Sequence, residues 1–232
     1  NKKQNEKMSS SFELDLDTIR MESIHAIKEL KKPKLVLILS GKRKSGKDYV
    51  EQLLIERYPD QILSFRISAP IKCEYARRNG LNYEELLTSS QYKESFRKQM
   101  VEWSESVRQY DPHHFLRIAI LDSYRQNNGH KKPIWILNDA RRPTDLRYFQ
   151  SDENEINLDN NCKQLTIRIR SDDSIRIDRG WKFTIGIDDQ TTECGLDEYQ
   201  QWNYRIDNNG GKDELLKELS PILSEIDMVI SS

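Results

Sequence analysis

The chain lacks the features that would place it in a membrane or outside the cell. Its three cysteines, Cys73, Cys162 and Cys194, are isolated, and their odd number does not suit a framework of disulfides. They also lack the C-x-x-C spacing of a zinc site, so a reducing compartment is expected. No apolar run approaches the ~20 residues of a membrane-spanning helix, and Asn1–Lys7 lacks the apolar core of a secretory signal. We therefore expect a cytosolic (cytoplasmic) protein that binds no membrane.

A large excess of charge of either sign is absent as well. The 37 basic and 38 acidic residues give a formal net charge of -1. Without a basic surplus or a continuous basic stripe, nucleic acid is not an expected partner. Hydrophobic residues make up only 36% of the 232, but they are clustered, and this length suits one α/β domain. We expect small-molecule partners and a monomer.

The most informative motif follows a short apolar run. Leu35–Ser40 reads LVLILS, and Gly41–Asp48 reads GKRKSGKD. A buried strand that leads into Gly-x4-Gly-Lys is the arrangement of a phosphate-binding P-loop. Its glycines let backbone N–H groups wrap around a polyphosphate, and the next helix points its positive end at the same place. One residue departs from the motif, because Asp48 stands where Ser or Thr usually meets magnesium.

We therefore assign nucleotide phosphates to the whole loop. The alternative, an ordinary basic loop before a helix, is disfavoured because the preceding strand makes a chance match rare. Lys47 is expected to reach the β- and γ-phosphates. The predicted ATP-binding residues of the loop are Gly41, Lys42, Arg43, Lys44, Ser45, Gly46, Lys47 and Asp48.

Apolar strands alternate with helical segments along most of the chain. This alternation predicts an α/β fold, a three-layer sandwich with a central parallel sheet and helices on both faces. Strands are expected at 35–40, 61–68, 134–137, 165–169 and 204–208, with helices at 48–57, 71–78, 82–87, 91–109, 111–125, 143–149 and from 213 onward.

The first 33 residues are predicted to be an N-terminal extension to a domain over 34–232. Ile19, Ile24 and Ile27 recur at roughly helical spacing, which indicates a short amphipathic helix or, alternatively, a disordered arm. The polar stretch 150–161 is expected to be a surface loop.

Two features follow the strand expected at 134–137. Asp139 would lie at the carboxyl end of that strand, beside the P-loop, where ligands collect in open α/β sheets. It could orient magnesium, or it could simply cap the helix that begins at Pro143. Arg141 and Arg142 come next, and Arg binds phosphate bidentately and stays charged, although paired arginines on a loop are often only solvated.

Further basic residues occur in two other segments. Residues 170–180 form a short polar stretch in which Arg176 and Arg179 follow Arg168, and we expect an Arg-rich lid there rather than an ordinary charged loop. The helices expected at about 69–110 are the natural place for a phosphoryl acceptor. They supply Lys72, Lys93, Arg97 and Arg108. The adjacent His113 and His114 would point apart on a helix, so a surface or capping position is expected for them.

Five stretches carry a resemblance to a known family. They are Leu39–Asp48 (LSGKRKSGKD), Tyr92–Lys98 (YKESFRK), Asp139–Arg142 (DARR), Arg179–Thr184 (RGWKFT) and Glu193–Asp197 (ECGLD). With them the chain resembles the animal-type phosphomevalonate kinase family from about Lys34 to the C-terminal helix. That family has a P-loop fold of the nucleoside-monophosphate-kinase type. Asp is its usual residue after the P-loop lysine, so Asp48 fits the resemblance.

The resemblance implies a kinase domain over 34–232. It implies ATP-dependent phosphorylation of (R)-5-phosphomevalonate to (R)-5-diphosphomevalonate, with Mg²⁺, in the mevalonate route to isoprenoids and sterols. The expected catalytic residues are Lys47, Arg141 and Arg142, and Arg168 and Arg179 join the loop in binding ATP. The expected acceptor-binding residues are Lys72, Lys93, Arg97, Arg108, Arg141, Arg142 and Arg176, and the expected magnesium ligands are Asp48 and Asp139.

Two other interpretations explain part of the pattern. A different small kinase of the same fold, with a nucleotide or another phosphorylated metabolite as acceptor, would also need the P-loop and the arginines. A non-catalytic protein could bind a nucleotide, or use Lys42–Lys44 for an anionic partner, without transferring phosphate. The downstream stretches Arg179–Thr184 and Glu193–Asp197 favour the phosphomevalonate kinase resemblance over both.

Overall fold

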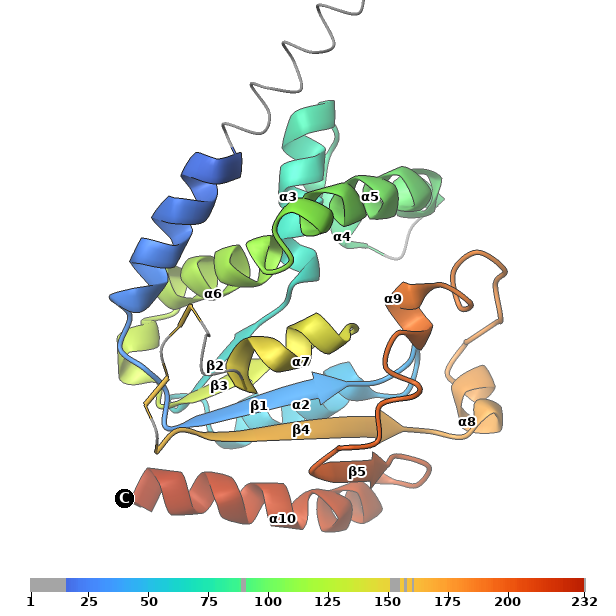
Figure 1. Cartoon of the computed structure of the whole chain (residues 1–232). Helices are drawn as coiled ribbons and strands as arrows, with labels where there is room; N and C mark the ends of the chain where they lie inside the picture. Colours follow the sequence, from blue (N-terminus) through green and yellow to red (C-terminus); the bar gives the residue numbers. More distant parts are fainter. Residues whose placement is uncertain (1–15, 89–90, 151–154, 157, 160, 232) are drawn as a thin grey trace, which may run out of the picture.

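A parallel sheet forms the centre of the molecule (Figure 1). The computed structural model describes residues 16–88, 91–150, 155–156, 158–159 and 161–231. Five strands pair in the order β2-β3-β1-β4-β5, and every pairing is parallel. The strands are β1 (Leu35–Ser40), β2 (Ile62–Phe65), β3 (Ile134–Leu137), β4 (Lys163–Arg170) and β5 (Tyr204–Asp207). The predicted α/β sandwich with a central parallel sheet is confirmed.

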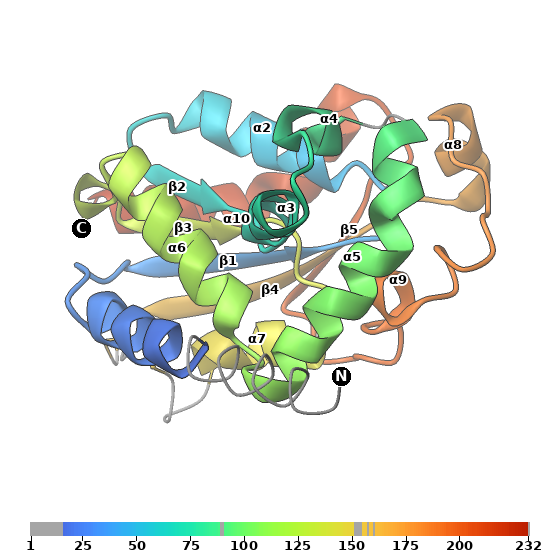
Figure 2. The same ribbon diagram turned by 90° about the horizontal axis from the view of Figure 1, so that it is seen from above.

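Helices cover both faces of this sheet, and the strand composition explains why. All residues of β1 and β3 are buried, as expected for strands covered on both sides. Alternate β1 residues enter different cores: Val36 packs with Phe115 and Phe149, whereas Leu37 packs with Leu54 and other residues of the second core. The first core belongs to α6 (His114–Gln126) and α7 (Pro143–Gln150), and the second to α2 (Lys47–Arg57) and α10 (Lys212–Ser231). Figure 2 shows α2 and α7 on opposite sides of the strands.

Three helices between β2 and β3 build the region expected to bind the acceptor. They are α3 (Ser68–Asn79), α4 (Tyr83–Leu87) and α5 (Gln91–Tyr110). Gly80 ends α3 in the left-handed region, with φ 61°. The Asn82 side chain caps α4 by accepting hydrogen bonds from the N–H groups of Glu84 and Glu85. The predicted helices of this region are thus confirmed, within a few residues at their ends.

Three shorter helices complete the described fold. A single 3₁₀ turn, η1 (Gly129–Lys131), precedes β3. The Arg-rich segment contains α8 (Asp173–Asp178), and α9 (Thr191–Cys194) follows it. In Figure 1 both lie at the carboxyl ends of the strands. Within the described part of the chain, no helix is long and apolar enough to cross a membrane.

The described part of the N-terminal extension packs against the first core. Residues 16–28 are helical, and Leu16 and Ile27 are buried among the residues of this core. Ser23 Oγ accepts a hydrogen bond from Arg117 Nε at 2.8 Å, and Arg117 is fully buried between the carboxylates of Asp111 and Glu155. Residues 16–28 are therefore attached by apolar and polar contacts. Residues 1–15, and the positions 151–154, 157 and 160 of the polar insert, lie outside the described residues, and a boundary near residue 34 stays a prediction.

The expectation for the histidine pair is wrong for His114. Its side chain is buried, and its ring packs edge-on against Phe115. His114 Nε2 lies 3.4 Å from Glu74 Oε2 on α3. The residue begins α6, and the first turn of this helix is covered by α3, so the predicted surface position is not available.

Shortening Ile27 to Ala should destabilise the whole domain. Ile27 has no exposed surface, and removing a buried Ile side chain to Ala typically costs about 3 kcal/mol. Met21 is 67% exposed on the same helix, so Met21→Ala is the matched control and should change stability by less than about 0.5 kcal/mol. Urea unfolding measures both. Equal stability of the two variants would show that the helix contributes nothing to the core.

Candidate active site

The P-loop lies between the end of β1 and the start of α2. Gly46 has φ 87°, in the left-handed region that favours glycine. A Cβ there would also lie 2.0 Å from Asn208 Nδ2, which donates a hydrogen bond to the Ser45 carbonyl at 2.9 Å. A residue that follows β5 therefore holds the loop in place, and any side chain at Gly46 would displace it.

A pocket of about 870 Å³ opens over this loop. The start of α2 supplies Lys47 and Asp48, whose charged groups lie 3.0 Å apart. Burial opposes the charge of Asp48, but Lys47 and Arg66 hold the pKa of this carboxyl below its usual value. Seven of the eight predicted loop residues line the pocket. They are Gly41, Lys42, Arg43, Lys44, Gly46, Lys47 and Asp48.

A second, smaller pocket of about 170 Å³ lies between α3, α5 and the start of α7. Its apolar wall is formed by Ile67, Ile71, Met100 and Val101. Six of the seven residues expected to bind the acceptor line it. They are Lys72, Lys93, Arg97, Arg108, Arg141 and Arg142. The fold thus brings these six predicted residues together from three separate segments, which are α3, α5 and the loop after β3.

The two pockets share three basic side chains. Lys93, Arg97 and Arg141 line both the P-loop pocket and the smaller pocket. Lys93 and Arg97 come from the first turns of α5, and Arg141 comes from the loop after β3. A ligand phosphate in either pocket would therefore meet the same three cations.

The far end of the smaller pocket carries two more arginines. Arg108 is 7% exposed and forms an ion pair with Asp145, at 3.4 Å between Nη1 and Oδ1. Arg142 pairs with Glu105. Among the described residues, Nε of Arg108 and Nε of Arg142 are buried without a hydrogen-bond partner. Buried donors are normally satisfied, so both atoms point to a ligand that accepts hydrogen bonds.

Lys93 has the most strongly perturbed amine of the site. Its burial, together with the nearby charges of Lys72 and Arg97, lowers the pKa of Lys93 from 10.5 to about 8. An anion bound beside it would favour the charged form again. Such a perturbed group in a pocket is typical of a functional site.

The structure separates the three arginines expected around the lid. Arg179 lies over the P-loop, where it donates to the Asn208 carbonyl at 2.8 Å. Arg168 donates to Ser40 Oγ and Asp197 Oδ1, both at 2.9 Å, beside a third pocket of about 380 Å³. Ser45, the loop residue missing from the P-loop pocket, lines this third pocket as well.

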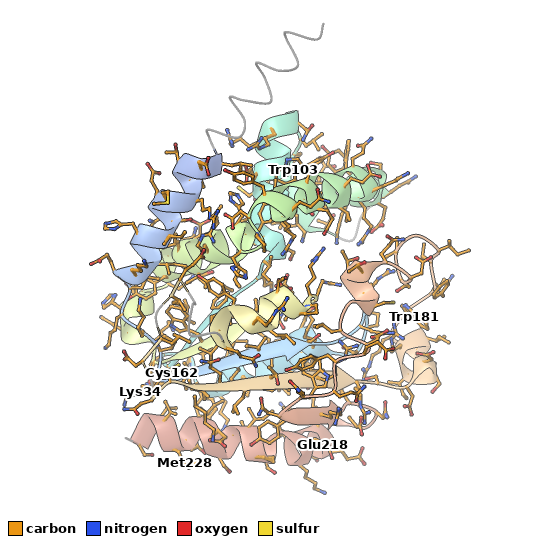
Figure 3. The ribbon with its side chains drawn as sticks, viewed as in Figure 1. Lys34, Trp103, Cys162, Trp181, Glu218 and Met228 are labelled. Carbon is orange, nitrogen blue, oxygen red and sulfur yellow. The ribbon has the colours of Figure 1, made fainter. Side chains whose placement is uncertain are left out.

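Arg176 does not line the acceptor pocket, contrary to the grouping expected from the sequence. Its side chain is buried, and its Nε donates to the Arg43 carbonyl at 2.9 Å. Its guanidinium lies 3.7 Å from the ring centre of Trp181, which Figure 3 places beside α8 and α9. The position of Arg176 in the Arg-rich stretch does not determine which pocket its side chain enters, because the orientation of α8 is set by packing.

Asp139 has the capping role that was weighed as the alternative, but for a different helix. Its two carboxylate oxygens accept hydrogen bonds from the N–H groups of Ile67 and Ser68, at 2.7 and 2.9 Å, at the start of α3. The start of α7 is instead capped by Asp145, which accepts from the N–H groups of Arg141 and Arg142. In the described ranges no group of three or more His, Cys, Asp or Glu side chains could hold a metal ion.

Acidic side chains hold several of these basic residues, and no local sequence pattern indicates them. Glu193 in α9 accepts hydrogen bonds from the Arg43 N–H, at 3.0 Å, and from Arg141. Arg43 also pairs with Asp188, at 3.0 Å. Further pairs join Lys42 to Asp197 and Arg66 to the buried Glu51. Glu193 lies 150 residues from Arg43 and 52 residues from Arg141 in the sequence, so the motif Glu193–Asp197 does not itself reveal these contacts.

The P-loop follows the central strand β1, and basic side chains converge on the pocket beside it. This combination defines a P-loop phosphotransferase. A model of the family described as phosphomevalonate kinase matches residues 39–155. The curated phosphomevalonate kinase of Drosophila melanogaster is 37% identical over 163 residues, which cover 70% of this chain and 82% of that protein. This chain belongs to the phosphomevalonate kinase family, as its motifs predicted, and members of a kinase family use ATP as phosphoryl donor. The crystal structure of TT1252 from Thermus thermophilus is a more distant likeness, with a TM-score of 0.47 and 15% identity over 84% of this chain and 98% of that one.

The charge of Lys93 should give the enzyme a pH dependence. Because its pKa is lowered to about 8, Lys93 is protonated below pH 8 and loses its charge as the pH rises through that value. We expect kcat/KM for the phosphorylated acceptor, which reports the free enzyme, to fall severalfold between pH 8 and 9. In Lys93→Arg the side chain stays charged, so this decline should disappear. An identical decline in both enzymes would assign it to another group.

Proposed function

We propose that this kinase transfers the γ-phosphoryl group of ATP to (R)-5-phosphomevalonate, producing (R)-5-diphosphomevalonate and ADP in the mevalonate route to isoprenoids and sterols. Membership of the family supports the reaction. The observation that carries the proposal is that Lys93, Arg97 and Arg141 line both pockets. Transfer between two phosphates needs the donor and the acceptor to meet among cations, and these three side chains mark that place.

The donor would bind in the P-loop pocket. The loop amides and the N-terminus of α2 face the β-phosphate, and Lys47 neutralises the β- and γ-phosphates. Arg179, which contacts the carbonyls of Lys44 and Asn208, would add a charge from the lid side. Arg43 supports the loop through its pairing with Asp188.

The residues present fit a magnesium ion that arrives with ATP. Mg²⁺ usually keeps several waters and takes one or two carboxylates in addition to substrate phosphates. Asp48 offers an exposed carboxylate beside Lys47, with only one oxygen in the Lys47 contact. Asp139 is less suited, because both of its oxygens already accept backbone N–H groups. When bound, the ion would neutralise charge on the β- and γ-phosphates.

The acceptor would lie with its phosphate toward the P-loop. Phosphomevalonate has a phosphate at one end and a carboxylate at the other, and formation of the 5-diphosphate requires the phosphate end to receive the γ-phosphoryl group. The shared cations would hold that phosphate. The unpartnered Nε atoms of Arg108 and Arg142 at the far end would then donate to the carboxylate. Ile71 and Met100, on the apolar wall, suit the methyl-bearing middle of the molecule.

The chemistry in this arrangement is positioning and charge neutralisation. The acceptor phosphate already carries a nucleophilic oxygen, so no side chain is needed as a general base. Arg141 would contact the transferring phosphoryl group as charge moves onto its oxygens, and Arg142 would act from the acceptor side. Arg179, from the lid expected at about 170–180, lines the P-loop pocket together with the later residues Thr184 and Ile187, which supports a lid that excludes water. A cytosolic location and a monomeric state are part of the proposal.

A coupled assay of ADP release tests the reaction. The wild-type protein should release ADP with phosphomevalonate and ATP, and at most at background rate with mevalonate, AMP or UMP. Lys47→Met and Arg141→Met should each lower kcat by about 100-fold, which equals about 3 kcal/mol of lost transition-state stabilisation. Turnover only with a nucleotide would favour the other small-kinase interpretation. ATP binding without turnover of any acceptor would favour the non-catalytic interpretation.

The orientation of the acceptor has its own test in Arg142. Arg142→Met should raise KM for phosphomevalonate by about tenfold or more, because a charge-assisted hydrogen bond contributes about 1.5–3 kcal/mol. KM for ATP should stay within about twofold. Arg147 is exposed on α7, which begins directly after Arg142, so Arg147→Met is the matched control and should change neither constant. A larger effect on KM for ATP than on KM for the acceptor would contradict the orientation.

A further inference from the structure

Four basic side chains of the site are held by acids from one segment, residues 188–197. Asp188 pairs with Arg43, Glu193 with Arg141, and Asp197 with both Lys42 and Arg168. Of these acids, Glu193 alone faces both halves of the site, because it lines the acceptor pocket and also contacts the P-loop backbone. Glu193 is therefore the acid of this segment whose loss would disturb the donor half and the acceptor half of the site together.

The two oxygens of Glu193 have different tasks. Oε2 accepts a hydrogen bond from the backbone N–H of Arg43 at 3.0 Å, and Oε1 accepts one from Arg141 Nη1. The Glu193 side chain is only 4% exposed, so water does not compete strongly for these oxygens. One buried carboxylate thus connects a residue of the donor loop with the arginine that lies between the two pockets.

Other contacts keep this carboxylate in a defined place. The carbonyl of Thr192, on the same short helix, also accepts from Arg141 Nη1. A Cβ at Gly195 would lie 2.7 Å from the Arg141 carbonyl, so α9 packs closely against the backbone of the arginine that it holds. Arg43 is held from the other side, because its carbonyl accepts from Arg176. The P-loop, α9 and Arg141 therefore form one connected unit.

We propose that Glu193 is a positioning residue, which fixes the Arg141 guanidinium relative to the P-loop so that one guanidinium serves both phosphates in the transfer. The proposal rests on the proposed function for its acceptor. A free arginine between two polyanions would follow whichever phosphate attracts it more strongly. Holding it costs affinity for neither substrate but keeps the reacting groups aligned, and a misplacement of about 1 Å can cost about 100-fold in rate. The effect of Glu193 is thus on kcat, not on either KM.

Glu193→Gln is the central variant. Glutamine keeps the shape, but only one of its two terminal atoms accepts hydrogen bonds, so it cannot hold the Arg43 N–H and Arg141 together. We expect kcat to fall tenfold or more, with KM for ATP and for phosphomevalonate within about threefold of wild type. Glu193→Asp keeps both oxygens on a shorter side chain and should recover part of the loss. The control Glu198→Gln removes an exposed carboxylate one residue beyond this segment and should leave kcat unchanged.

A double-mutant cycle with Arg141→Met separates positioning from a purely structural role. If Glu193 acts through Arg141, then Glu193→Gln should lower kcat by less than about twofold in the Arg141→Met background. The same tenfold loss in both backgrounds would overturn the proposal, as would an equal kcat for Glu193→Gln and wild type. A fall in either KM would show instead that the carboxylate competes with a substrate phosphate, which also overturns it. If Glu193→Gln does not fold, Glu193→Asp enters the cycle in its place.

The same assay distinguishes this proposal from the proposed function. If the wild-type protein phosphorylates another acceptor and not phosphomevalonate, the proposed function fails, and the cycle is run with the acceptor that is used. A loss of kcat that depends on Arg141 would then still support the role of Glu193. If phosphomevalonate is the acceptor and the cycle is additive, only the positioning role fails.

Discussion

The repulsion between basic side chains at one edge of the sheet is the constraint on which the site depends. Lysines and arginines from five segments converge where the parallel strands end, and without counter-charges they would separate. Acids oppose many of them, as with Lys42 and Asp197, Arg108 and Asp145, or Arg142 and Glu105. The more exposed of these pairs, such as Lys42 and Asp197, contribute little stability each. Their value here is that the arginines occupy defined positions before any phosphate arrives, and the same balance gives a net charge of -1 in a chain built to bind polyanions.

The strand order decides which residues can meet at that edge. In the order β2-β3-β1-β4-β5 the chain leaves β1 toward β2 and β3 on one side and then passes from β3 to β4 on the other side of β1, so the loop after β1 lies at a switch point of the sheet. The loop after β3 then brings Arg141 to one flank of the P-loop, and the end of β4 brings Arg168 to the other. The helices α3 to α5, which are inserted between β2 and β3, cover this edge of the sheet on the β3 side (Figure 1). The acceptor pocket therefore lies on that side, whereas the lid segment follows β4.

Much of this arrangement could be predicted from the sequence, because local signals carried it. The buried runs fixed the strands, Gly-x4-Gly-Lys after β1 marked the P-loop, and Asn82 and Gly80 marked helix ends. Local signals could not predict the features that depend on how distant segments of the chain pack together. Asp139 has the same local sequence context whether it meets a metal or caps α3, and only the packing of α3 decides. His114 is buried because α3 covers its helix, and Arg176 points to the P-loop because of Trp181. The acidic partners such as Glu193 were hidden by their sequence distance.

The contact between Asn208 and the P-loop determines when, during synthesis and folding, the chain can first bind ATP. The hydrogen bond from Asn208 to the Ser45 carbonyl joins residues 163 positions apart, and the one from Arg43 to Glu193 joins residues 150 apart. The loop itself is therefore synthesised well before the groups that hold its shape. Contacts of such long range form late, after most of the chain is collapsed. A nascent or truncated chain can therefore contain the complete phosphate-binding motif and still be unable to present it, and the ability to hold ATP marks a chain that has finished folding.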